Sequence, residues 1–141
     1  MNLMNLNLLI KNLPHRYPFR MIDTLVVLDP GKMAKAIKRI SNDELFLKGN
    51  LKDYPLFPAI LIIEALAQTG GIALLADKEE ETPSAYLVRI DDIKFLKTIM
   101  VGDTLLLEAK IQKVFGKLAK VEVKAEREDE IVALGYLVLG F

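Results

Sequence analysis

The sequence contains very few of the residues that bind metals or act as nucleophiles. Its 141 residues include no cysteine and a single histidine, His15. Without cysteine there is no disulfide, no thiolate nucleophile and no cysteine-ligated metal, and such a composition suits the cytoplasm. One histidine also cannot supply the paired imidazoles of a typical zinc site. No nucleotide-binding loop or other cofactor motif is present, so we expect neither a metal nor a cofactor.

The chain also lacks an excess of charge of either sign. Nineteen basic residues balance 19 acidic ones, which argues against nucleic acid or an anionic membrane surface as a partner. The apolar fraction of 52% is enough for one domain over residues 1–141 and leaves apolar surface that an oligomer interface can cover. The apolar N-terminal segment has no basic cluster and no small-residue cleavage site, so no signal peptide is indicated.

One long hydrophobic run, residues 59–76, dominates the middle of the chain. It follows a loop broken by prolines, and Pro58 suits the first turn of a helix because its missing N–H would have no partner there. A helix that is apolar on every face belongs inside a protein. Glu64 and Gln68 are the strongly polar residues of its first part and, four residues apart, share one face. These residues and the break at 69–71 argue against a membrane span.

The rest of the chain predicts strands. Residues 119, 121, 123 and 125 are apolar and alternate with charged residues, as in a strand with one buried and one solvated face. We expect a short helix over residues 3–13 and strands near residues 21–28, 33–40, 84–100, 105–115, 117–127 and 131–139, with a bend at 91–92. This order favours an α+β fold in which an antiparallel sheet is wrapped around one long buried central helix.

The loop and the start of the helix resemble the hot-dog-fold beta-hydroxyacyl-acyl-carrier-protein dehydratases. That family reads Gly-His-Phe-Pro-x-x-Pro-x-x-Pro-Gly-Val-Leu-x-x-Glu-Ala-x-Ala-Gln. The matching residues are Gly49, Pro55, Pro58, Leu61, Glu64, Ala65, Ala67 and Gln68; Asn50, Leu51, Lys52 and Ala59 differ, and Asn50 stands at the family's histidine. The segment 13–23 and the turn 101–103 are also similar, so the resemblance covers nearly the whole chain.

The resemblance implies roles for six residues. In the family, the histidine at the position of Asn50 removes the proton alpha to a thioester carbonyl, and the glutamate matching Glu64 handles the departing hydroxyl. The amide N–H of Ala59, at a helix N-terminus, would polarise the carbonyl. Gly49, Pro58 and Gln68 complete the expected substrate-binding loop and helix. On sequence alone, a structural carboxylate at Glu64 and a turn residue at Asn50 remain alternatives.

Three further side chains have a simpler interpretation. His15 lies in a family motif that packs near the site without being the catalyst, so a structural histidine is the better interpretation. Lys94 and Lys97 could meet an acidic carrier protein or a phosphopantetheine phosphate, but a solvated strand edge is the default for such lysines.

The function predicted from the resemblance is dehydration of 3-hydroxyacyl to 2-enoyl thioesters in fatty-acid biosynthesis, with activity reduced or lost because asparagine does not titrate near neutrality. The acyl group would be carried by acyl-carrier protein or coenzyme A. It would lie in a tunnel at the interface of a homodimer, or of a hexamer built as a trimer of dimers. A hot-dog acyl-thioesterase that uses Glu64 and a non-catalytic acyl-thioester-binding protein are the alternatives.

Overall fold

The computed structural model describes residues 15, 19–41, 56–78 and 84–141. The helix expected over residues 3–13 lies outside the described residues, as do Gly49 and Asn50. The described part consists of strands and one helix, in the order two strands, the helix and four strands.

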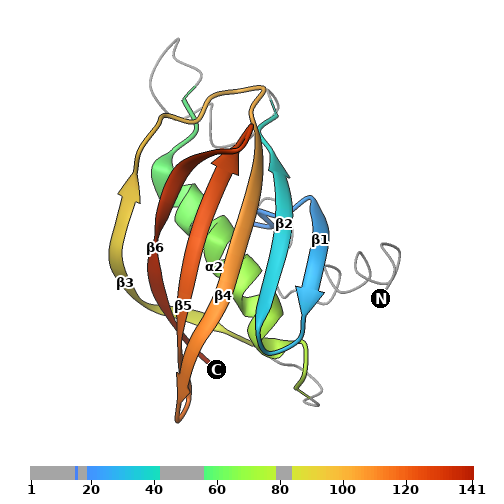
Figure 1. Cartoon of the computed structure of the whole chain (residues 1–141), viewed down its shortest axis with the longest axis vertical. Coiled ribbons are helices and arrows are strands. Elements are labelled where there is room, and N and C mark those ends of the chain that lie inside the picture. Colours follow the sequence, from blue (N-terminus) through green and yellow to red (C-terminus); the bar gives the residue numbers. More distant parts are fainter. Residues whose placement is uncertain (1–14, 16–18, 42–55, 79–83) are drawn as a thin grey trace.

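The strands form one six-stranded sheet in which every neighbouring pair is antiparallel (Figure 1). They are β1 (Thr24–Asp29), β2 (Met33–Arg39), β3 (Tyr86–Phe95), β4 (Thr104–Phe115), β5 (Leu118–Arg127) and β6 (Glu130–Gly140). Their order across the sheet is β1-β2-β4-β5-β6-β3, so β1 and β3 are the two edges. The three hairpins β1–β2, β4–β5 and β5–β6 place strands that are adjacent in sequence side by side.

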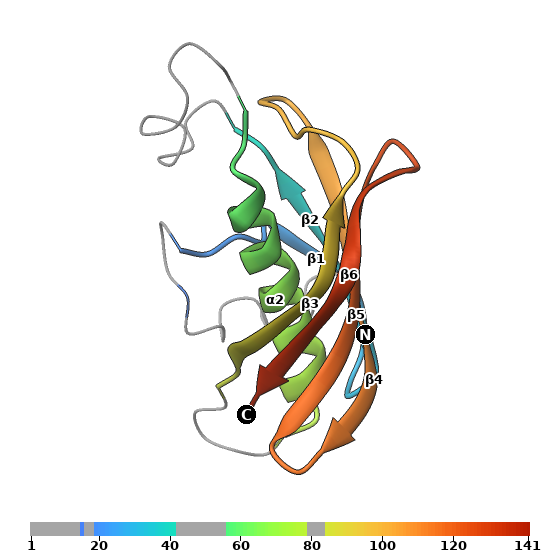
Figure 2. The ribbon, with the colours of Figure 1, turned by 90° about the vertical axis from the view of Figure 1, so that its left-hand side faces the viewer.

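The helix α2 (Ala59–Leu75) lies across the concave face of this sheet (Figure 2). Gly70 allows it to approach closely, because a Cβ there would lie 3.2 Å from Leu139 Cδ1 and 3.4 Å from Val121 Cγ1. Most of the helix is buried, as the sequence predicts, but Ile60 in its first turn remains 63% exposed. In the part of the chain that the structure describes, no helix has the length and apolar character needed to cross a membrane.

The alternation predicted for β5 is confirmed. Ala119, Val121, Val123 and Ala125 are all buried beneath the helix, while Glu122 between them is exposed. The same face of β2 and β4 carries further alanines, Ala34, Ala36 and Ala109. Small side chains at the centre of a sheet let a helix pack close to the backbone.

Two features of the strands, a bulge and the end of β3, are defined only by the structure. The expected bend at Asp91-Asp92 is a bulge: the pairing of β3 with β6 shifts between Asp91 and Lys94, and Asp92 has a φ of 50°. The strand ends at Phe95, earlier than the residue 100 predicted from sequence. β3 ends here because its partner strand ends here as well. Phe95 lies opposite Ala133, and β6 begins at Glu130, only three residues before Ala133.

Candidate active site

Gln68 joins the segment before β1 to the helix. It is 2% exposed, and its carboxamide is fully used. The Nε2 group donates to the carbonyl oxygen of Phe19 at 2.7 Å and to Oε1 of Glu64 at 3.0 Å, while Oε1 accepts from the backbone N–H of Met21 at 2.9 Å. Gln68 therefore fixes both the position of residues 19–21 over α2 and the direction of the Glu64 carboxylate.

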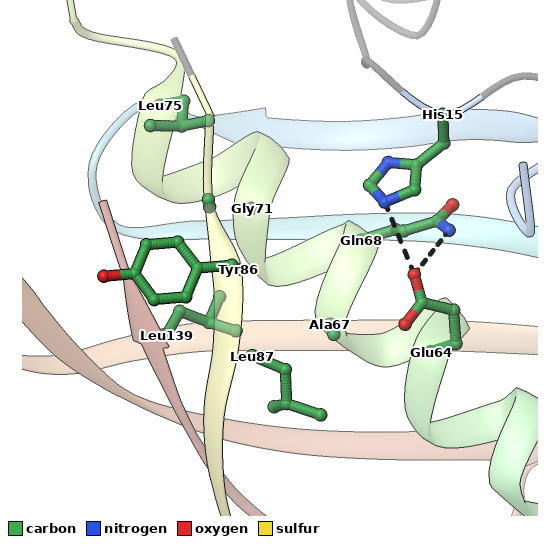
Figure 3. Close-up of a pocket in the computed structure, with 10 residues that line it drawn as sticks. His15, Glu64, Ala67, Gln68, Gly71, Leu75, Tyr86, Leu87 and Leu139 are labelled. Atoms are coloured by element: carbon green, nitrogen blue, oxygen red, sulfur yellow. Dashed lines mark hydrogen bonds and ion pairs between the residues drawn. The ribbon is translucent and has the colours of Figure 1, made fainter.

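Glu64 lies one helical turn before Gln68, on the face of α2 that the sheet does not cover. Its side chain is 37% exposed, so it is half-buried in a single chain rather than enclosed in apolar surroundings as the sequence indicated. The contacts of the carboxylate with Gln68 and with His15 are both made by Oε1. Figure 3 shows the second oxygen turned away from these two contacts, which leaves it available to a ligand.

His15 approaches Glu64 from the segment that precedes β1. Its Nε2 atom lies 3.4 Å from Oε1 of Glu64, and its side chain is 29% exposed. A distance of this size permits an ion pair when the imidazole is protonated, and a small movement converts it into a hydrogen bond. The resemblance places His15 near the site but does not predict this contact, because the two residues are 49 positions apart and the contact depends on how the segment before β1 crosses the helix.

A cavity of about 220 Å³ opens beside this pair. Figure 3 shows its walls, which come from α2, from β3 and from the end of β6. The lining residues are His15, Glu64, Ala67, Gln68, Gly71, Leu75, Ala85, Tyr86, Leu87 and Leu139. The polar groups His15, Glu64 and Gln68 gather at one end, and the other end is mainly apolar. Such a lining fits an elongated apolar ligand whose reactive group meets the carboxylate.

Two glycines determine the shape of the apolar end of the cavity. Gly71 lies on the cavity side of α2, and among the described residues a Cβ there would meet Ala85 Cβ alone, at 3.7 Å. Gly140, opposite Tyr86 in the β3–β6 pairing, makes room for the tyrosine ring, since a Cβ at Gly140 would lie 2.5 Å from its Cζ atom. The ring of Tyr86 can therefore lie flat across the end of β6, where it forms one wall of the cavity.

The structure brings together only some of the site residues predicted from sequence. Glu64 and Gln68 lie together in the cavity. Pro58 and Ala59 lie at the start of α2, outside the cavity lining, and Ala59 is five residues, or about 7.5 Å of helix, from Glu64. Gly49 and Asn50 lie outside the described residues.

The chemistry available at the cavity is that of proton transfer. Imidazoles and carboxylates are the side-chain groups that enzymes most often use as general acids and bases. Among the described residues, no group of three or more histidine and acidic side chains is arranged to hold a metal ion. The cavity therefore places a carboxylate and an imidazole beside a mainly apolar wall.

A single helix on the concave face of a six-stranded antiparallel sheet defines the hot-dog fold. Solved structures agree. The chain superposes on a chain of the dehydratase heterocomplex ApeI:P from Xenorhabdus doucetiae with a TM-score of 0.80 at 15% identity, covering 94% of this chain and 89% of that one. An uncharacterized protein from Pyrococcus horikoshii gives a TM-score of 0.67 at 22% identity, with 85% and 82% covered. At these identities the likeness concerns the fold.

Sequence comparison gives the family. The model of the FabA-like domain matches residues 13–135. The chain is 41% identical over 120 residues to a 3-hydroxyacyl-[acyl-carrier-protein] dehydratase FabZ from Listeria welshimeri, covering 85% of this chain and 83% of the relative. A protein of the same name from Natranaerobius thermophilus is 41% identical over 128 residues, with 91% and 90% covered. The chain therefore belongs to the FabA-like family, and its enzyme class is that of these dehydratases, the lyases.

Proposed function

We propose that this protein dehydrates 3-hydroxyacyl thioesters to 2-enoyl thioesters in fatty-acid biosynthesis, with acyl-carrier protein or coenzyme A as the carrier. The observation that carries the proposal is the fixed position of Glu64. Gln68 holds one carboxylate oxygen at 3.0 Å, and the acid stands at the polar end of an otherwise apolar cavity. An acyl chain fits the apolar walls, and its hydroxyl would then meet the carboxylate.

The reaction needs a group that protonates the departing hydroxyl, and in the proposal this group is Glu64. The second requirement is stabilisation of the negative charge that develops on the thioester carbonyl. The first N–H groups of α2, beginning at Ala59, have no partner within the helix and suit that charge. Turnover is expected to be low, because Asn50 stands where the family has its histidine and an amide does not accept the proton.

The proposal includes a homodimer, because two adjoining apolar surfaces are open in the single chain. The edge strand β3 exposes Tyr86, Val88 and Ile90, which are 61%, 47% and 41% exposed. Ile60 of α2 is 63% exposed on the uncovered side of the helix. Pairing of two β3 edges would cover the first surface and extend the sheet. The start of α2 in one chain would then contribute to the cavity of the other, and three such dimers would make the hexamer that the resemblance implies.

The test is the steady-state hydration of a 2-enoyl thioester, which is the reverse of dehydration. Low but measurable activity is expected from the native protein. Glu64→Gln should lower this activity by about 100-fold or more, the usual effect of losing an acid–base group. Asn50→His should raise the activity by supplying the missing base.

Other outcomes distinguish the alternatives. Hydrolysis of the thioester that is abolished by Glu64→Gln, without hydration of the enoyl group, would identify a thioesterase. Saturable binding of acyl thioesters with neither reaction, and no gain in Asn50→His, would identify a binding protein. Either outcome would overturn the dehydratase proposal.

A further inference from the structure

The sole imidazole of the sequence lies beside the carboxylate that the proposed reaction uses. His15 Nε2 is 3.4 Å from Glu64 Oε1, and both side chains line the same cavity. Both residues belong to one chain, so the pairing does not require a second subunit. A histidine with only a packing role has no need to direct its ring nitrogen at the Glu64 carboxylate.

We propose that His15 and Glu64 form the acid–base pair of this protein and together carry out both proton transfers of the dehydration. This inference rests on the dehydratase function proposed above and deepens it, because it assigns the group that compensates for Asn50. In the resting pair, Glu64 and His15 share one proton.

The two groups are arranged so that each can act without displacing the other. Gln68 and His15 both contact Oε1 of Glu64, which leaves Oε2 to face the substrate. Gln68 also holds the carbonyl of Phe19, four residues after His15, at 2.7 Å. The same buried carboxamide therefore limits the movement of both members of the pair. Among the residues that line the cavity, the other titratable group is the Tyr86 phenol, at the far end.

These two groups alone account for every proton that moves in the reaction. His15 Nε2 takes the proton from C2 of the 3-hydroxyacyl thioester, and the electrons of the C–H bond form the C2–C3 double bond. The C3–O bond breaks, and the departing oxygen takes the proton from Glu64 Oε2 and leaves as water. His15 then holds one proton and Glu64 is a carboxylate. Transfer of that proton across the 3.4 Å contact restores the resting pair.

The decisive variant is His15→Gln. The glutamine amide nitrogen can occupy the position of Nε2 and still donate to Glu64, but it does not exchange a proton near neutral pH. If the pair is catalytic, His15→Gln lowers kcat for hydration of the enoyl thioester by about 100-fold or more, with little change in KM. Preserved thermal unfolding and preserved binding of an unreactive acyl thioester are the checks that the variant is folded.

Making His15→Gln in the Asn50→His variant as well distinguishes a catalytic role of His15 from a role in positioning Glu64. In Asn50→His a histidine at position 50 supplies the base, so adding His15→Gln should cost clearly less than in the native protein. A supporting role predicts the same fold loss in both backgrounds. His15→Ala provides an independent measurement, because free imidazole added to the assay should restore part of its turnover.

The outcomes distinguish this inference from the function on which it rests. A native protein that hydrates enoyl thioesters but loses under threefold in His15→Gln would overturn the His15 assignment and leave the dehydratase proposal intact. Equal losses in both backgrounds, together with no rescue of His15→Ala by imidazole, would overturn it as well. A native protein and an Asn50→His variant that are both inactive would overturn the dehydratase function itself, and the pair with it.

Discussion

Gln68 donates a hydrogen bond of 3.0 Å to Oε1 of Glu64, the residue one helical turn before it. The same amide nitrogen bonds the carbonyl of Phe19, and the amide oxygen bonds the N–H of Met21. Gln68 thus couples the direction of the candidate catalytic acid to the path of the chain that precedes β1. A residue that serves the fold and the site through one buried group should affect both when it is changed.

Gln68→Ala should lower the free energy of unfolding by about 2–4 kcal/mol, because it removes three hydrogen bonds and leaves the backbone groups of Phe19 and Met21 unpaired. Chemical denaturation measures this loss. Gln68→Glu is the matched variant: it keeps the acceptor for Met21 but places a second carboxylate beside Glu64, so its stability deficit should shrink as the pH falls. A deficit that is independent of pH would contradict this account of the contact.

Gly71 and Gly70 should respond oppositely to alanine. At Gly71 a methyl group meets Ala85 at an ordinary contact distance and nothing else in the described part of the chain, so Gly71→Ala should raise helix stability by about 0.5–1 kcal/mol. At Gly70 the methyl group would press against Leu139 and Val121, and that crowding should cancel the gain or reverse it. Thermal unfolding of the two variants under the same conditions tests the contrast.

Gly71→Ala should also narrow the cavity that Gly71 lines. We expect its KM to rise for long acyl thioesters and to change little for short ones. A uniform change in KM across chain lengths would show that the acyl chain does not pass this residue.

Ile90→Lys should dissociate the proposed dimer. Ile90 is 41% exposed on the edge strand β3, and a lysine on an exposed edge opposes pairing with another strand. Val114→Lys is the control, because Val114 is 50% exposed on β4, which β5 and β6 separate from β3 in the sheet. Light scattering coupled to size exclusion should give a monomer for the first variant and a dimer for the second. If both variants stay dimeric, the chains associate elsewhere.

Glu108, on the outer face of β4, should make the stability depend on pH. Its side chain is 7% exposed and lies between Lys35 at 3.5 Å, Lys110 at 3.0 Å and Lys124 at 3.7 Å. Burial alone would raise the pKa of this carboxyl, but the hydrogen bond from Lys110 and the charges of Lys124, Lys110 and Lys35 outweigh it and hold the pKa below the ordinary value of 4.5.

Because the pKa of Glu108 is lower in the folded state, the unfolded chain binds the proton more readily than the folded chain. The ion cluster therefore stabilises the fold above about pH 4.5. This stabilisation is lost as the pH falls through the pKa of the folded state. Glu108→Gln should therefore lower the free energy of unfolding by about 1–3 kcal/mol at neutral pH, because three lysines remain without their buried acid. The difference from the native protein should vanish in acid. A difference of the same size at every pH would mean that packing, not charge, is responsible.

The sequence predicts the elements well because each has a periodic pattern of its own. The hydrophobic run beginning at Ala59 could only be a buried helix or a membrane span, and the alternation of residues 119–126 could only be a half-buried strand. The end of β3 could not be predicted in this way, since it depends on where β6 begins. The same limit applies to the uncovered side of α2, where Ile60 is exposed although the helix is apolar all round.

The candidate site is predicted in part for a related reason. Glu64 and Gln68 are visible in the sequence because they are polar residues in an apolar helix, one turn apart. The resemblance places His15 near the site, but its contact with Glu64 is not visible in the sequence. The contact depends on the path of the chain before β1, where Gln68 donates to Phe19 and accepts from Met21 in the folded chain. On sequence alone His15 was interpreted as structural; its approach to Glu64 is what motivates the catalytic role proposed here.

The solitary imidazole has a practical consequence for experiments in solution. Because the sequence has one histidine and that histidine borders the cavity, the carbon-bound ring protons of the whole protein give a single pair of histidine signals in a nuclear magnetic resonance spectrum. Those signals need no assignment and no added label. A ligand that binds in the cavity would change the chemical shifts of these signals. The protein therefore contains an intrinsic probe at the proposed site.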